Sequence, residues 1–182
     1  MSVDRTFTDL TSAGFDELAE LTGPNDNNRL PTLEDEYTDA RQESVELAED
    51  FSTALEEFLD VLQESGDVEE VYITGIRDDA IGAVLLQLDQ AVGQLGVAND
   101  VKEAGAGKHK VSEYLENSQG YFNDANEELS GLKTWIADEE AVPLDDPTVS
   151  DEFTEFSMAV DKFMSVVSSF QSYLSVLLNE LE

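Results

Sequence analysis

The stretch 149-VSDEFTEFSMAVDKFMSVVSSFQSYLSVLLNEL-181 decides the fold of this protein. Its apolar residues recur at alternating steps of four and three, the heptad spacing that aligns side chains along one edge of a helix. At about 1.5 Å per residue such a helix is about 50 Å long, and its apolar edge has to be covered by something. This edge consists of Val149, Phe153, Phe156, Val160, Phe163, Val167, Phe170, Leu174, Leu177 and Leu181.

The apolar edge is wider than a two-stranded coiled coil requires. Ala159, Val166 and Tyr173 widen it on one side, and Met164 and Leu178 on the other. A two-stranded coil buries a narrow stripe, whereas a helix of a bundle buries a broad one. The segment therefore predicts a bundle helix.

The opposite side of this helix carries serine and no charge. From Phe163 to Asn179 there is no acidic or basic residue, although the chain as a whole is very acidic. Because an unpaired charge is costly to desolvate, an uncharged face favours contact with another subunit; a solvated serine surface is the alternative. The predicted interface comprises Met164, Ser165, Ser168, Phe170, Ser172, Leu174, Ser175, Leu177, Leu178 and Leu181.

Three further long amphipathic helices are expected, at about 33–65, 79–97 and 110–138, before the last one at 148–182. We predict an all-α protein in which these four helices form an up-down-up-down bundle (residues 32–182), with a short N-terminal helix and linker (residues 1–31) packed along or across it. Residues 67–77 fit either a short strand or the lead-in to a helix. Helix 79–97 is nearly uncharged and is expected to be central, yet it spans only about 28 Å. The longer helices should therefore overhang it.

The charge of the chain indicates the environment in which the protein works. The chain has 182 residues with 42 Asp and Glu against 9 Lys and Arg, a formal charge of −33, yet 41% of its residues are hydrophobic. Regular apolar spacing argues against disorder. The composition, and no motif, resembles that of acidic proteins of salt-in archaea and their viruses. That resemblance implies the cytoplasm of a halophile or a virus particle, where molar salt shortens the Debye length to about 3 Å.

Several classes of partner are disfavoured. Direct nucleic-acid binding needs clustered Lys and Arg, although an acidic mimic of nucleic acid stays open. There is no Cys, hence no disulfide or thiolate metal site. The two charge-poor segments, 80–99 and 163–179, are interrupted by polar residues, and no membrane span is expected.

One small basic cluster stands out on the acidic chain. Lys102, Lys108, His109 and Lys110 fall within nine residues around the loop 98–108. A solvated loop is the plain interpretation. The alternative is a basic contact loop for an acidic partner, for example a neighbouring copy of the same protein.

No motif for catalysis, cofactor binding or metal binding is present. The chain has one His, no Glu-x-x-His pair and no Gly-x-Ser-x-Gly turn. Carboxylates are so frequent that their spacing carries no information, and an acid–base pair or a carboxylate-only metal site stays open. We predict a non-enzymatic structural or assembly protein of a halophilic archaeon or its virus, such as a virion connector or tail-associated component, self-associating through helix 149–181. A cytoplasmic helical adaptor or regulator of a partner protein is the alternative.

Overall fold

The computed structural model describes residues 6–22, 34–138, 140 and 142–181. The protein is 90% helical, and the described residues contain no strand, so the all-α prediction is confirmed. A π-helical turn, η1, joins α3 to α4, so that α3, η1 and α4 form one continuous helix. The elements are α1 (Phe7–Thr22), α2 (Glu34–Ser65), α3 (Glu70–Thr74), η1 (Gly75–Ala80), α4 (Ile81–Glu103), α5 (Lys108–Asp138) and α6 (Pro147–Leu181).

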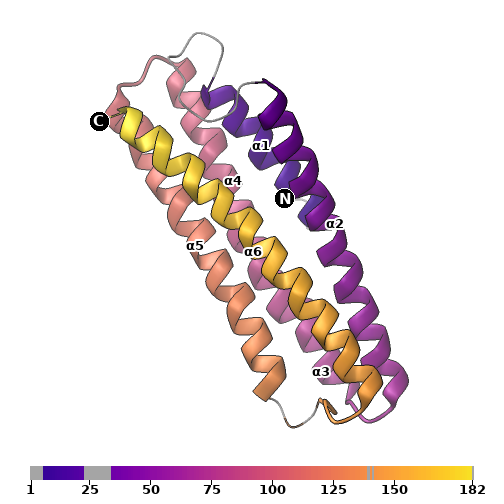
Figure 1. The fold of residues 1–182 in the computed structure, drawn as a ribbon. Coiled ribbons are helices and arrows are strands. Elements are labelled where there is room, and N and C mark those ends of the chain that lie inside the picture. The colour runs from indigo at the N-terminus through magenta and orange to yellow at the C-terminus, as the bar shows by residue number, and fades with distance from the viewer. Residues whose placement is uncertain (1–5, 23–33, 139, 141, 182) are drawn as a thin grey trace.

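The helices surround one core. α6 lies between α2 and α5, and α4 packs on α5 (Figure 1). At the α3 end of the molecule, α2 contacts α3 directly, whereas farther along α1 lies between α2 and α4. One end is therefore built from four helices, and the other end from five because α1 is inserted there.

α1 is an integral part of this core. Its first turn is closed by a reciprocal cap, in which the Asp9 N–H donates to Thr6 Oγ1 at 3.2 Å and the Thr6 N–H donates to Asp9 Oδ2 at 3.5 Å. Its C-terminal half is held by α4, because Asn99 Nδ2 donates to the Glu17 carbonyl at 2.9 Å and Lys102 Nζ to the Leu21 carbonyl at 2.8 Å. Its buried apolar face is Phe7, Leu10, Phe15, Leu18 and Leu21.

Gly14 permits this close packing. A Cβ atom at Gly14 would lie 2.9 Å from two ring carbons of Phe170 and 3.6 Å from a methyl carbon of Val92. A glycine inside a helix weakens it by roughly 0.5–1 kcal/mol relative to alanine. Its presence here is explained by the approach of α1 to α6 and α4.

The heptad edge of α6 is covered by the chain's own helices. Its phenylalanines at seven-residue intervals each stack on a phenylalanine of α2 or α5, and such ring pairs add to the free energy gained by burying their area. Each stacked pair has an interplanar angle of 8°. The distances between ring centroids are 5.3 Å for Phe156–Phe58, 5.1 Å for Phe163–Phe51 and 4.8 Å for Phe170–Phe122.

The bounds predicted for the second of the four long helices are wrong. The helix runs from Glu70 to Glu103 over 34 residues, not from 79 to 97. Of the two interpretations of residues 67–77, the lead-in to a helix is confirmed, because residues 70–77 form its first turns. It is thus about as long as its neighbours, and the expected overhang disappears. It is also not central, because Leu86 on its outer face is 54% exposed.

The same helix is the one in the described part of the chain whose length and composition would suffice to cross a membrane. Its most apolar window has a mean hydropathy of 1.2, and 33% of that window is buried inside the protein.

Candidate functional site

The structure divides the interface predicted on α6 into two groups. Phe170 and Leu174 lie inside the chain's own core, with Phe170 only 2% exposed between α1 and α5. Neither side chain is presented to a partner. Four further apolar members of the set are half-buried and pack against the same core at the outer edge of α6, namely Met164, Leu177, Leu178 and Leu181.

The serines of α6 have partners within the molecule. Ser175 Oγ accepts a hydrogen bond from Gln119 Nε2 at 2.8 Å, and Ser168 Oγ one from Asn126 Nδ2 at 3.1 Å. These pairs step by seven residues in opposite directions along α5 and α6, and the Lys133–Asp161 ion pair at 2.6 Å continues the series. Ser165 and Ser172 are exposed and donate to backbone carbonyls of their own helix. Part of the uncharged face of α6 thus lies at its contact with α5, where polar side chains of the two helices pair.

The four predicted basic residues lie together at the turn between α4 and α5, but they are not equivalent. Lys102 closes the end of α1, as described above. Lys110 pairs with Glu113 at 3.0 Å and lies over the Tyr114 ring, 5.1 Å from its centroid. The hydrogen bond to Glu113 and its charge raise the pKa of Lys110. Lys108 and His109 are exposed in the first turn of α5.

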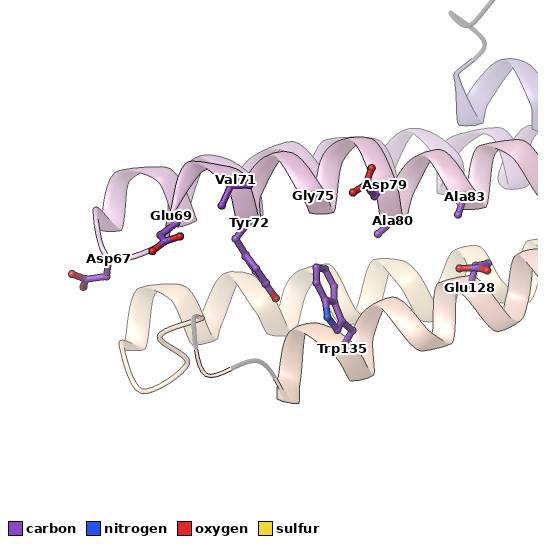
Figure 2. A pocket seen from close by; sticks show the side chains of 10 residues that line it. All are labelled: Asp67, Glu69, Val71, Tyr72, Gly75, Asp79, Ala80, Ala83, Glu128 and Trp135. Carbon is purple, nitrogen blue, oxygen red and sulfur yellow. The ribbon is translucent and has the colours of Figure 1, made fainter.

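A groove that no sequence pattern predicted lies at the opposite end of α5. It encloses about 850 Å³ between α5 and the helix segment that contains α3, η1 and the start of α4. Figure 2 shows the lining side chains, with Tyr72 and Trp135 lying between the two helices. The lining residues are Asp67, Glu69, Val71, Tyr72, Gly75, Asp79, Ala80, Ala83, Glu128 and Trp135.

Small side chains and the π-helical turn create this space. Gly75, Ala80 and Ala83 face α5 where bulky residues would otherwise close the gap, and a Cβ at Gly75 would meet nothing within 4 Å. A π-helical turn rotates the residues that follow it, and such turns are frequent at functional sites. Here three of its members, Gly75, Asp79 and Ala80, line the groove.

The groove presents apolar surface to solvent. Trp135 is 41% exposed although it stacks on Tyr72 with ring centroids 5.0 Å apart, and Val71 is 73% exposed. Tryptophan is a frequent anchor residue of protein interfaces, because a large rigid ring is buried at little cost in conformational entropy. These exposed residues give a ligand apolar surface to cover.

The charge of the groove has one sign. Four of its lining residues are acidic, Asp67, Glu69, Asp79 and Glu128, and none of the ten is basic. Arg77 belongs to η1 but is not among the lining residues. A groove that holds an exposed tryptophan, and whose charged lining residues are all acidic, suits an ammonium or guanidinium group that can pair with acid and contact the ring. The lining contains no Ser, Cys, His or Lys.

One signal of the π-helical turn is present in the sequence. The buried residues Ile73 and Ile76 are followed by Ile81 and Val84, so that a step of five interrupts steps of three. A step of five is the spacing of an i→i+5 turn. The predicted start of the helix at residue 79 falls within this step of five. The exposure of Trp135 has no such signal, because the residue lies next to the apolar stripe of α5.

A second group of carboxylates lies between α2 and α6. Among the described residues, Glu57, Glu152 and Glu155 each bring one carboxylate oxygen within 4.8 Å of the others. Burial, and then the charges of Glu155, Glu57 and Asp151, raise the pKa of Glu152. These like charges repel one another across the helix interface.

Glu152→Gln is expected to stabilise the protein near neutral pH. Because the pKa of Glu152 is higher in the folded than in the unfolded state, the folded state binds more protons between the two values. The free energy of unfolding therefore falls as the pH rises through that window. Urea unfolding at about pH 7 and about pH 4 measures this effect, since an ordinary Glu titrates near 4.3.

The gain should be present at the higher pH and largely absent at the lower. Glu116→Gln is the matched control, because Glu116 is exposed on α5 outside the cluster. Equal gains for both variants would mean that general charge reduction, and not the cluster, is the cause.

Comparison with known proteins adds no relative: no family model, curated protein or solved structure matches this chain.

Proposed function

We propose that this protein is a non-enzymatic helical assembly protein whose groove binds a cationic segment of another protein. The observation that carries the proposal is the exposed Trp135 beside Val71, within a groove whose charged lining residues are all acidic. An apolar anchor with a polar rim is the usual anatomy of a protein-binding site. An adaptor role and an assembly role both use such a site.

The surface next to the groove supports an interaction role. Between Gly82 and Val97 the helix carries a single charge, Asp89, in a protein of formal charge −33. Leu86 is exposed on this face, and Cβ atoms at Gly82 and Gly93 would meet nothing within 4 Å. Charged residues are depleted from the centre of protein interfaces. A partner held in the groove would have this nearly uncharged face beside it.

The helical bundle carries the groove, and its acidic surface indicates where the protein works. We treat the four long helices as an up-down-up-down bundle, with α1 inserted at one end. The bundle holds the groove rigidly at the other end. The acidic surface suits molar salt, in the cytoplasm of a salt-in halophile or in a virus particle. In that setting a groove of carboxylates selects partners by contact, because long-range attraction is screened.

Titration with a cationic peptide tests the groove. Trp135 is the only tryptophan of the chain, so its fluorescence reports directly on this site. A tryptophan-free peptide of lysine, alanine and leucine, added in about 1 M KCl, is expected to shift the emission and to saturate, because it buries the exposed ring. The same peptide with glutamate in place of lysine should give no shift.

Two glycine substitutions locate the binding. Gly75→Leu places a side chain in the groove, where a Cβ would meet nothing within 4 Å, whereas Gly120→Leu adds the same side chain to an exposed position of α5 outside the groove. Both should preserve or raise the melting temperature, since glycine is a poor helix former. Only Gly75→Leu should abolish the peptide response. If both variants respond as wild type does, the groove is not the site and the proposal fails.

A further inference from the structure

The start of α5 departs from the usual charge preference of a helix. Its first turn contains Lys108, His109 and Lys110 and no acidic residue. The amino end of a helix carries a partial positive charge that favours Asp and Glu and disfavours Lys. A chain with 42 acidic and 9 basic residues nevertheless places two of its lysines there. Departures from a local rule mark positions where function, not stability, sets the residue.

The turn at this end of the molecule has small side chains. The turn between α4 and α5 consists of alanine and glycine, and Gly105 adopts a positive φ of 83° that reverses the chain tightly. Lys108 and His109 are exposed beside it. The result is a slim basic tip, defined here as residues 104–110.

The basic tip and the acidic groove lie at opposite ends of the same two helices (Figure 1). About 30 Å of α4 separates Ala83, at the edge of the groove, from Glu103, at the base of the tip. The continuous helix holds them apart, so the tip cannot enter the groove of its own molecule. It can enter the groove of a second copy.

We propose that the basic tip of one copy docks into the groove of the next, so that the protein assembles head to tail. The inference rests on the proposed function, because it supplies the cationic segment that the groove binds. An ammonium group of Lys108 would lie against Trp135 while the groove carboxylates pair with the tip. Such a contact joins two different surfaces, and it therefore generates an open chain or a closed ring.

Salt is expected to promote this assembly. Two copies of formal charge −33 repel each other over long distances when ionic strength is low. At about 1 M salt the Debye length is about 3 Å, so long-range repulsion is screened while groups in direct contact still attract. The free energy gained by burying the exposed Trp135 and Val71 does not depend on charge, so it is retained at high salt.

Two variants that each disable one surface test the proposal. The tip variant is Lys108→Glu with Lys110→Glu, and the groove variant is Gly75→Leu. Light scattering after gel filtration in about 1 M KCl is expected to give multimers for the wild type and the monomer mass of 20.0 kDa for each variant alone. An equimolar mixture should form a capped dimer of about 40 kDa, twice 20.0 kDa, because one intact tip and one intact groove remain.

Lys162→Glu is the control for charge, because Lys162 is exposed on α6 away from both surfaces. It should leave the multimer intact, whereas Lys108→Glu alone should weaken it. Lys108→Glu should also raise the melting temperature, since it removes an unfavourable cation from the start of α5. Loss of assembly together with higher stability excludes misfolding as the cause.

A wild-type monomer in molar salt overturns the head-to-tail contact, and so does a mixture of the two variants that stays monomeric. In either case the peptide response of Trp135 decides separately whether the groove binds cationic segments at all. Multimers that persist in both variants would also overturn the contact and would place self-association on another surface, such as the uncharged face of α4.

Discussion

Phe170→Asp is expected to unfold the protein rather than to release intact subunits from one another. Phe170 is buried among Phe15, Phe122 and Gly14, with ring centroids 4.8 Å from each of the two phenylalanines. Removing a buried phenylalanine costs about 3–5 kcal/mol, and burying an ionised carboxylate in its place costs more. Domains of this size are stable by roughly 5–15 kcal/mol. We expect loss of helical circular dichroism and of cooperative melting in about 1 M KCl.

Ser172→Asp is the matched control. It adds the same side chain to the same helix two residues away, at an exposed position. We expect it to change the melting temperature little, because isolated surface charges alter stability by less than about 0.5 kcal/mol. A folded Phe170→Asp variant that merely loses mass in light scattering would contradict the core assigned here and would restore Phe170 to an intermolecular interface.

Removal of salt is expected to unfold the wild type. Lowering KCl from about 1 M to about 0.01 M lengthens the Debye length from about 3 Å to about 30 Å. Carboxylates all over the surface then repel one another. The effect should be largest at α2, where residues 34–64 contain twelve acidic side chains and one basic side chain, and where Glu57 meets Glu152 and Glu155 of α6. Helical circular dichroism followed during dialysis measures the loss.

Sucrose separates charge screening from a general weakening of apolar burial. Sucrose favours the compact state by being excluded from the protein surface, but it does not screen charge. At equal osmolality KCl should therefore restore much more helix than sucrose does. Equal recovery in the two solutes would remove electrostatic repulsion as the cause. Full helicity at low salt would remove the adaptation to salt altogether.

Sequence periodicity predicted most of the core and little of the candidate site. The heptad edge of α6 is buried as expected from Phe156 to Leu174, because the spacing of apolar residues predicts which face of a helix is buried. Ser118 also lies in a core position of α5, and its hydroxyl donates to the Ala91 carbonyl of α4 at 2.7 Å. Spacing does not state which helix covers a face. The interface predicted on α6 therefore included Phe170 and Leu174, which α1 and α5 cover.

The groove was missed for a different reason. It forms where small residues of η1 and α4 lie opposite Trp135 of α5, and residues 75–83 and 135 are far apart in the sequence. Their juxtaposition depends on the helix crossing and on the π-helical turn, neither of which a heptad pattern specifies. The basic tip, in contrast, is a local cluster and could be identified from the sequence alone.

The sequence by itself determined the helical class, the buried edges of the long helices and the extreme acidity, because each of these is a property of local spacing or of composition. Only the tertiary structure decided that α1 enters the bundle, that the edge of α6 is covered within one chain, and that the second of the four long helices begins at Glu70. Those outcomes depend on which distant surfaces fit together. An example is the close approach of α1 that Gly14 allows to Phe170, since complementary packing is a property of pairs of segments and not of either one alone.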